Sequence, residues 1–385
     1  MNIQAGVTSR HRRLFGVRCK GVVVIPNTTR WTGPWLGATR RLSLQRVANR
    51  PIVCHVLDTM LDAGIVDIAV LLPHDAIGEI SACISAEGPP GISVRYLEHD
   101  PEESPDQALT AVAEFAAGDL CVLHRANGML GEPLAQFAES LRADSLDALL
   151  LVQDDGQEAP RLRLVGQRQR PLDPIAEGSP ALPAAAGVCV LGPGALRRLG
   201  TGTAQTGTGR RLNAEGTEPG QELDLALMAL ALAREGARVY TRAVQGWRIF
   251  TGDAQDLLAM NRAALDRLDP EATTVATGGN RFEGAVAIHP TASVTSSVII
   301  GPVIIGADAL IADSYIGPHT SIGERVRIEG AELERSIVLA DASLLHVGGR
   351  LVASVVGRQA RIFRDFSMPR ALRLHVGDGD EVALC

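Results

Sequence analysis

The chain has 385 residues, of which 46% are hydrophobic and 21% charged, and its formal net charge is −7. This length suggests two domains, and the hydrophobic content excludes general disorder. The acidic balance argues against a nucleic-acid binder, which would carry a basic face. No apolar run reaches the roughly 18 residues that a membrane-spanning helix needs, so we expect a cytoplasmic protein with no membrane partner.

Residues 1–18 contain several arginines but no apolar segment, and we expect a disordered arm there rather than a signal peptide. From residue 19 to 268, short apolar runs alternate with segments of helical spacing. The predicted strands cover 20–26, 65–72, 94–97, 120–123, 146–152, 162–165, 187–191 and 239–244. The predicted helices cover 51–63, 75–86, 106–116, 223–235 and 254–268. Residues 201–220, rich in Gly and Thr, are expected to form a loop.

This alternation predicts a Rossmann-like α/β domain with a mostly parallel sheet covered on both faces. Ligands of such sheets bind beyond the carboxyl ends of the strands. The loops after Ile25 and Leu123 are therefore the expected site. The six cysteines show no CxxC pairing, and we interpret them as small buried hydrophobes in a reducing compartment.

After a linker at 269–284, the pattern changes to apolar residues at intervals of six, as in Ile288, Val294 and Ile300. Ile-Gly pairs recur, for example at Ile316 and Ile322. Such a period predicts a parallel β-helix over 285–385, in which each coil buries its aliphatic residue against the coil below. An antiparallel sheet would instead alternate with a period of two.

An α/β domain followed by such coils resembles the sugar-1-phosphate nucleotidyltransferases, above all the long form of glucose-1-phosphate thymidylyltransferase from antibiotic clusters. The segments that carry the resemblance are 301–306, 314–323 and 336–339 in the coils, VANRPI at 47–52, DAGI at 62–65 and LHVGD at 374–378. The resemblance implies a left-handed coil and a role in antibiotic biosynthesis or other specialised metabolism. It also implies transfer of a nucleotidyl group to a sugar phosphate, which requires a Gly-rich phosphate loop, cations and two carboxylates for Mg²⁺.

The phosphate-binding devices of that family depart from its pattern. The loop expected to read GGxGTRL is Pro26 followed by Asn27, Thr28, Thr29 and Arg30, with no glycine. Pro26 also lacks an N–H donor. The PK motif falls near Arg41, and arginine does not replace lysine well at a tight site. Lys20 is the only lysine of the chain and precedes the first strand, so no lysine can reach the phosphates.

The metal and sugar motifs depart as well. The family's LGDN is represented by Leu123-His124-Arg125-Ala126-Asn127, without a carboxylate, and its WKDTG by 248–252, with Phe250 at the aspartate. We therefore expect no Mg²⁺ and no other cofactor or metal. His99 corresponds to the glutamine that reads the base, and Asp173 is what remains of the EKP motif.

One group of candidate site residues is cationic. His124 and Arg125 end a predicted strand and could form an anion clamp with Arg30, Arg41 and Arg248; the alternative is that they are solvated loop residues. The ligand-binding candidates that we retain are Asn27, Thr28, Thr29, Arg30, Arg41, His99, Asn127, Asp173 and Arg248, and His124 and Arg125 become catalytic candidates if the cleft has new chemistry.

Three hypotheses follow. The first is a degenerate nucleotidyltransferase, a pseudoenzyme or regulatory subunit that forms homo-oligomers or pairs with an active paralogue through its β-helix. The second is a repurposed enzyme that acts on a phosphorylated or acidic metabolite in the old cleft. The third is a residual thymidylyltransferase in which arginine replaces lysine. A nucleotide or phosphorylated metabolite is the expected small-molecule partner, and no nucleic acid is expected.

Overall fold

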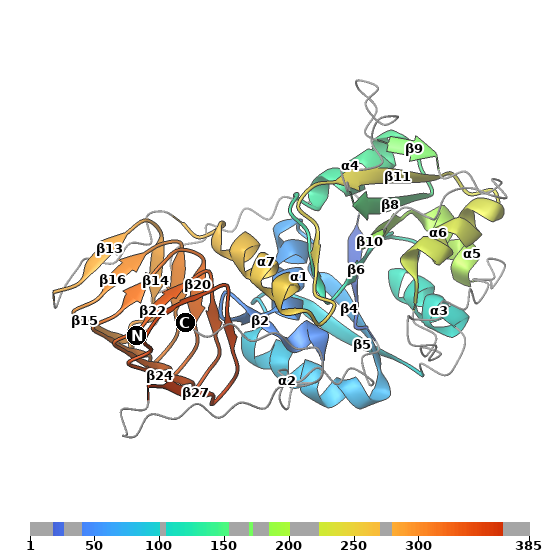
Figure 1. Cartoon of the computed structure of the whole chain (residues 1–385). Coiled ribbons are helices and arrows are strands. Elements are labelled where there is room, and N and C mark those ends of the chain that lie inside the picture. Colours follow the sequence, from blue (N-terminus) through green and yellow to red (C-terminus); the bar gives the residue numbers. More distant parts are fainter. Residues whose placement is uncertain are drawn as a thin grey trace, which may run out of the picture.

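The computed structural model describes residues 18–26, 41–100, 105–153, 169–171, 185–200, 223–269 and 279–364. They form an α/β domain followed by a parallel β-helix (Figure 1), so the predicted fold class is confirmed. Outside the described residues lie the site candidates Asn27, Thr28, Thr29, Arg30 and Asp173, the strand predicted at 162–165 and the loop predicted at 201–220. Among the described helices, none is long and apolar enough to cross a membrane.

The α/β domain is built on one eight-stranded sheet with the order β5-β4-β1-β6-β10-β8-β11-β9. Its first half is parallel: β1 (Cys19–Val24), β4 (Asp67–Pro73), β5 (Ser93–His99) and β6 (Leu120–Arg125). In the second half β10 (Ala185–Leu191) runs antiparallel to both β6 and β8 (Ala148–Gln153), and β9 (Gln169–Pro171) runs antiparallel to β11 (Val239–Val244). The sheet is thus mostly parallel, as predicted, with two reversed strands.

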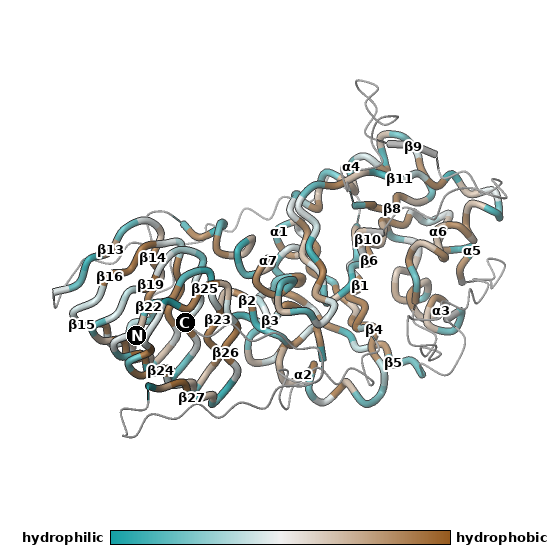
Figure 2. The backbone as a smooth tube through the Cα atoms, viewed as in Figure 1, coloured by the Kyte–Doolittle hydropathy of each residue, from teal (hydrophilic) through white to brown (hydrophobic). Residues whose placement is uncertain are grey.

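Helices cover both faces of this sheet, because its central strands are apolar on both sides (Figure 2). One face packs against α1 (Ile52–Asp62), α2 (Ile77–Glu87) and α4 (Ala135–Ala143). The other packs against α3 (Pro105–Ala116), α5 (Pro193–Gly200) and α6 (Leu225–Arg234). The short helices α4 and α5 were missed in the sequence, since each has only two or three turns of apolar spacing.

The β-helix consists of three five-stranded parallel sheets, which are its three sides. The first contains β13 (Arg281–Glu283), β16 (Val298–Ile300), β19 (Tyr315–Ile316), β22 (Glu332–Glu334) and β25 (Arg350–Val352). The second contains β14 (Val286–Ile288), β17 (Val303–Ile305), β20 (Thr320–Ile322), β23 (Ile337–Val338) and β26 (Val355–Val356). The third contains β15 (Ser293–Thr295), β18 (Leu310–Ala312), β21 (Arg327–Glu329), β24 (Ser343–Leu345) and β27 (Arg361–Phe363).

The coil interior is a stack of aliphatic side chains, as the six-residue period predicted, but the predicted register is one residue late at Ile300, which is only partly buried, while Ile299 points inward. Ile299, Ile316 and Leu333 occupy one row of neighbouring strands, and all three are fully buried. Each added coil therefore removes one aliphatic side chain per sheet from water. Triangular coils with strands of two or three residues are consistent with the left-handed form that the resemblance implies.

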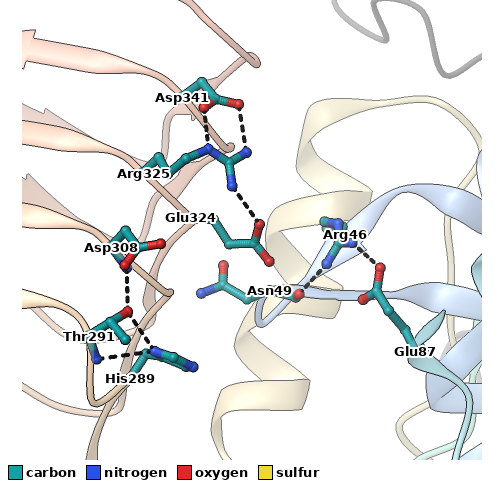
Figure 3. Close-up of polar contacts among 9 residues, drawn as sticks. All are labelled: Arg46, Asn49, Glu87, His289, Thr291, Asp308, Glu324, Arg325 and Asp341. Carbon is teal, nitrogen blue, oxygen red and sulfur yellow. Dashed lines mark hydrogen bonds and ion pairs between the residues drawn. The ribbon is translucent and has the colours of Figure 1, made fainter.

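The two regions share an apolar interface, in which α7 (Ala254–Leu265) lies between them (Figure 1). The hairpin formed by β2 (Arg46–Val47) and β3 (Arg50–Pro51) completes it. Its polar contacts include His319 Nε2 with Asp266 Oδ1 at 2.8 Å and those of two asparagines. Asn49 Nδ2 donates to the Ile322 carbonyl at 2.6 Å; Asn261 Oδ1 accepts from the Ala48 amide at 2.8 Å, and its Nδ2 donates to the His319 carbonyl at 3.2 Å. Figure 3 draws Arg46 and Asn49 beside the β-helix corner that carries Glu324 and Arg325.

Candidate functional site

The carboxyl ends of four neighbouring strands meet at one edge of the sheet. In the register of β1, Val24 lies beside Leu71 of β4 and Arg125 of β6, and Pro73 of β4 lies beside His99 of β5. His99 and Arg125 are the last residues of their strands, and both are partly exposed. Parallel strands bring their ends to one edge of the sheet, so both residues lie at this edge, and ligand binding by either stays a prediction.

His124 does not face this edge. Its side chain is fully buried, and its ring lies 5.6 Å from that of Trp247. Nδ1–H donates to the Arg125 carbonyl at 2.8 Å, and burial lowers the pKa of His124 to about 4. The imidazole is therefore neutral near pH 7 and offers no positive charge to an anion. The alternative interpretation as a solvated loop residue is wrong for His124, because the residue lies within β6 and its side chain is buried.

Trp247 fills a slot between strand ends, and the sequence reasoning missed it. Its indole is 2% exposed and lies against the α-carbons of Gly128 and Gly187. A Cβ atom at Gly187 would lie 2.7 Å from the ring, and one at Gly128 would lie closer still. Gly128 belongs to the short strand β7 (Gly128–Met129), which pairs with β12 (Arg248–Ile249) directly after the tryptophan. The only sequence signal was a pair of glycines, whose shared neighbour is more than 50 positions away.

Phe250 stands where the resemblance places the second carboxylate. Its side chain is fully buried, with an exposed fraction of 0%. It packs with Ile52, Leu257 and Ile337 in the interface to the β-helix. Its amide donates to the Asn127 carbonyl at 2.8 Å, and Asn127 Nδ2 donates back to the Phe250 carbonyl at 3.0 Å. Asn127, a ligand-binding candidate, thus uses Nδ2 to hold the turn after β12, whereas its buried Oδ1 has no hydrogen-bond partner among the described residues.

Arg41, a candidate for phosphate contact, is paired with carboxylates. Its Nη2 lies 3.1 Å from Asp75 Oδ2, and its Nε lies 3.5 Å from Glu79 Oε2. The guanidinium side chain is only 9% exposed, whereas both carboxylates are more than half exposed. The group of three side chains therefore carries a net charge of −1. Arg248, by contrast, is exposed and uses Nη1 to donate to the Trp247 carbonyl at 2.8 Å.

Lys20 lies where its place in the sequence predicted. Lys20 sits at the amino end of β1, where Nζ donates to the Phe115 carbonyl at 2.7 Å and lies 3.7 Å from Asp119. It is thus at the end of the sheet opposite the candidate site. Within the described ranges no group of three or more His, Cys, Asp or Glu side chains could hold a metal ion.

The curated proteins that this chain matches are nucleotidyltransferases. It is 28% identical to a glucose-1-phosphate thymidylyltransferase of Streptomyces antibioticus, with 90% of this chain and 94% of the relative covered. The corresponding enzyme of Streptomyces griseus is 25% identical, and the low-salt glycan biosynthesis nucleotidyltransferase Agl11 of Haloferax volcanii is 24% identical; each match covers 88% of this chain and 92% of the relative. No protein-family model matches the chain.

Among solved structures, one described as a glucose-1-phosphate thymidylyltransferase of Bacillus anthracis, in complex with sucrose, superposes with a TM-score of 0.46 at 17% identity. The superposition covers 63% of this chain and 95% of that one. The sequence matches extend through both the α/β domain and the β-helix. This chain is therefore similar over nearly its whole length to proteins named as nucleotidyltransferases, two of which are glucose-1-phosphate thymidylyltransferases.

Proposed function

We propose that this chain is a sugar-1-phosphate nucleotidyltransferase-like protein that no longer performs the parental transfer. In this proposal it acts as a regulatory or scaffolding subunit in specialised metabolism. It assembles through its β-helix, either with copies of itself or with an active paralogue. A nucleotide or a phosphorylated metabolite remains a candidate ligand of the strand-end edge.

The single observation that carries the proposal is the environment of Phe250. A Mg²⁺ site needs carboxylate oxygens around an open position. The residue at the expected second carboxylate is instead an aromatic ring with no solvent exposure, packed into the interface between α7 and the β-helix. At the expected first carboxylate the chain has a buried neutral histidine and an arginine. These residues do not fit a magnesium ion, and we derive no catalytic step through one.

The electrostatics support the same proposal. Nucleotidyl transfer depends mainly on positioning and on neutralising phosphate charge. Arg41 is neutralised by Asp75 and Glu79, and Lys20 lies at the opposite end of the sheet. A triphosphate approaching Arg41 would meet two exposed carboxylates first, and like charges at close range oppose binding.

The apolar interface between the two regions supports a scaffolding role. The family-like segments of the coils are packed around it: Ser321 and Ile337 lie on the outward row of the second sheet, against α7 and the β2–β3 hairpin. Phe250 belongs to this packing. The residue at the expected carboxylate therefore contributes apolar area to the interface between the domains, where its burial stabilises their packing.

The test is direct. The purified full chain is mixed with glucose-1-phosphate and each NTP, with and without Mg²⁺, and pyrophosphate release is followed beside a catalytically active relative as control. We expect no release above the protein-free blank. Turnover within about a hundredfold of the control would overturn the proposal. Titration calorimetry with dTTP and UTP then separates the alternatives: binding without turnover supports a regulatory subunit, and turnover with arginine in place of lysine supports a residual transferase.

A repurposed enzyme is the second candidate, because His99 and Arg125 do share the strand-end edge. A cation and a titratable ring at such an edge suit a phosphorylated or acidic metabolite. Alanine at Arg125, at His99 and at His124 in separate variants tests it, with thermal unfolding as the control for fold. If each variant remains folded and the pathway product is unchanged in the producing cell, this candidate is excluded.

A further inference from the structure

A groove lies on the outside of the β-helix, at the corner between its third and first sheets. Its volume of about 630 Å³ falls within the range of about 300–1,000 Å³ that small-molecule pockets have. Residues 346–349 separate β24 from β25 at this corner, whereas residues 313–314 separate β18 from β19 and residues 330–331 separate β21 from β22. The coil that contains β24 therefore has a longer corner than the coils before it, and its residues 347–349 line the groove.

Tyr315 and Arg350 bring an aromatic ring and a cation to this groove. The Arg350 guanidinium lies over the Tyr315 ring, 4.8 Å from its centroid, and Arg350 Nε donates to Glu332 Oε2 at 2.9 Å. In the register of the first sheet Glu332 lies between the other two, so this ion pair holds the arginine across the sheet face. Arg350 Nη1 also lies 3.7 Å from Glu334 Oε2. The group thus offers an aromatic ring beside N–H donors and carboxylate oxygens.

The floor of the groove is formed by buried residues with satisfied hydrogen bonds. Ser314 Oγ donates to the Ala312 carbonyl at 2.6 Å and accepts from the Ala331 amide at 3.3 Å, and Ser314 and Ala331 are both buried. Gly330 has a φ of +60°, and a Cβ atom there would lie 2.6 Å from His346 Nδ1, so the glycine leaves room for the longer corner. A floor that is already ordered lowers the entropic cost of binding a ligand.

Asp313 supplies a further acceptor at the rim. It is exposed at a coil corner with a φ of +49°, and within the described part of the chain its carboxylate has no hydrogen-bond or ion-pair partner. The charged side chains that line the groove are Asp313, Glu332 and Arg350, two negative and one positive. A phosphate group would meet the two carboxylates, and a cation would meet the guanidinium. A neutral polar ligand meets neither repulsion.

We propose that this groove binds a neutral mono- or disaccharide. A sugar ring has an apolar C–H face, for which Tyr315 and Val347 supply apolar surface. Its hydroxyl groups both donate and accept: Asp313 and Glu332 are the acceptors, and Arg350 is the donor. Hydrogen bonds between hydroxyls and charged groups are stronger than those between neutral groups. The groove lies on the β-helix, away from the strand-end edge of the α/β domain, and nothing in the proposed function requires it.

The test is titration of the purified full chain with maltose and glucose, followed by calorimetry and by saturation-transfer NMR. We expect saturable binding of at least one of the two sugars in the millimolar range. Glucuronate, a sugar of similar size that carries a carboxylate, should bind at least about threefold more weakly than glucose, because it brings a third negative charge into the groove. Spermidine tests the alternative of a cation site, and binding of spermidine without binding of either sugar would overturn the proposal.

Variants locate the binding. Asp313→Asn removes the charge at the rim and should weaken sugar binding at least about fivefold, and asparagine tolerates the left-handed conformation of this corner. Tyr315→Leu should weaken it by a similar factor, because the aromatic face is lost. Asp308→Asn is the matched control: Asp308 is also exposed at a corner, with a φ of +56°, but it does not line the groove, so binding should stay within about twofold of the parent.

Thermal unfolding shows whether each variant keeps the fold of the parent chain. The proposal is overturned by the absence of saturable sugar binding up to about 100 mM, which is weaker than specific recognition gives. It is equally overturned by sugar binding that Asp313→Asn leaves unchanged, even if Tyr315→Leu fails to fold. None of these results depends on whether the chain releases pyrophosphate, so the groove and the proposed function can fail separately.

Discussion

Replacing Phe250 by aspartate would place a carboxylate at the position where the family resemblance implies one. We predict that Phe250→Asp yields a destabilised protein and no metal site, because the side chain at this position is fully buried between α7 and the β-helix. Truncating a buried phenylalanine costs about 3–5 kcal/mol, and burying a carboxyl without a partner adds to this. The total, about 5 kcal/mol or more, is comparable with the whole stability of many domains.

The assay is urea unfolding of Phe250→Asp, with Phe250→Leu and Phe250→Asn as matched controls. The leucine variant keeps the site apolar and should cost about 1 kcal/mol. The asparagine variant stays neutral at every pH. Burial raises the pKa of an introduced carboxyl, so the unfolded state ionises first as pH rises, and the aspartate variant should lose stability relative to the asparagine variant between pH 4 and 7. A stable Phe250→Asp protein that binds Mg²⁺ by calorimetry would refute this reasoning.

Three further predictions concern the same region. Gly128→Ala should lower the unfolding midpoint by several degrees, because its Cβ would overlap the Trp247 ring, whereas Gly78→Ala in α2, where a Cβ meets nothing within 4 Å, should be neutral or stabilising. Asn261→Ala should lower the free energy of unfolding in urea by about 2–3 kcal/mol, since it leaves the Ala48 amide and the His319 carbonyl without their partner. The control Gln255→Ala, on the exposed face of α7, should lower it by less than about 0.5 kcal/mol. Burial lowers the pKa of His55 and of His124 to about 4, so the unfolded state binds protons first as pH falls below 6.5. The contribution of each histidine to the free energy of unfolding should be complete above pH 6.5 and fall by as much as about 3 kcal/mol towards pH 4. If unfolding of His124→Phe depends on pH as steeply as unfolding of the parent chain, the prediction is wrong.

The β-helix is the part of the fold that its sequence specifies most fully. Its period is local, because an aliphatic residue about every six positions needs only the next coil as a partner. Ile316, Ile322 and Ile328 are buried as the period predicts, whereas Ile299 takes the inward position predicted for Ile300. The strands and longer helices of the α/β domain were also predictable, because burial on both faces of a sheet leaves continuous apolar runs. The direction of β10 was not, since an apolar run reads the same in a parallel and an antiparallel strand.

The candidate site was predictable only in outline. His99 and Arg125 end the parallel strands β5 and β6, which are separated by β4 and β1, so their shared edge of the sheet followed from the order of the elements. His124 is one position earlier than Arg125, and this single step turns its side chain to the opposite face of the strand, into the core. Sequence spacing placed both residues at the strand end. Only the structure shows that the His124 side chain is buried and that Arg125 is partly exposed.

The sequence by itself determined which chemical groups this protein has: one lysine, no glycine at residues 26–30, and a phenylalanine at the expected carboxylate. Only the tertiary structure decided what those groups contact. Arg41 meets Asp75 and Glu79, and Trp247 meets two glycines. Each of these contacts joins residues that are far apart in the chain, and their approach depends on how helices and strands pack rather than on any local pattern.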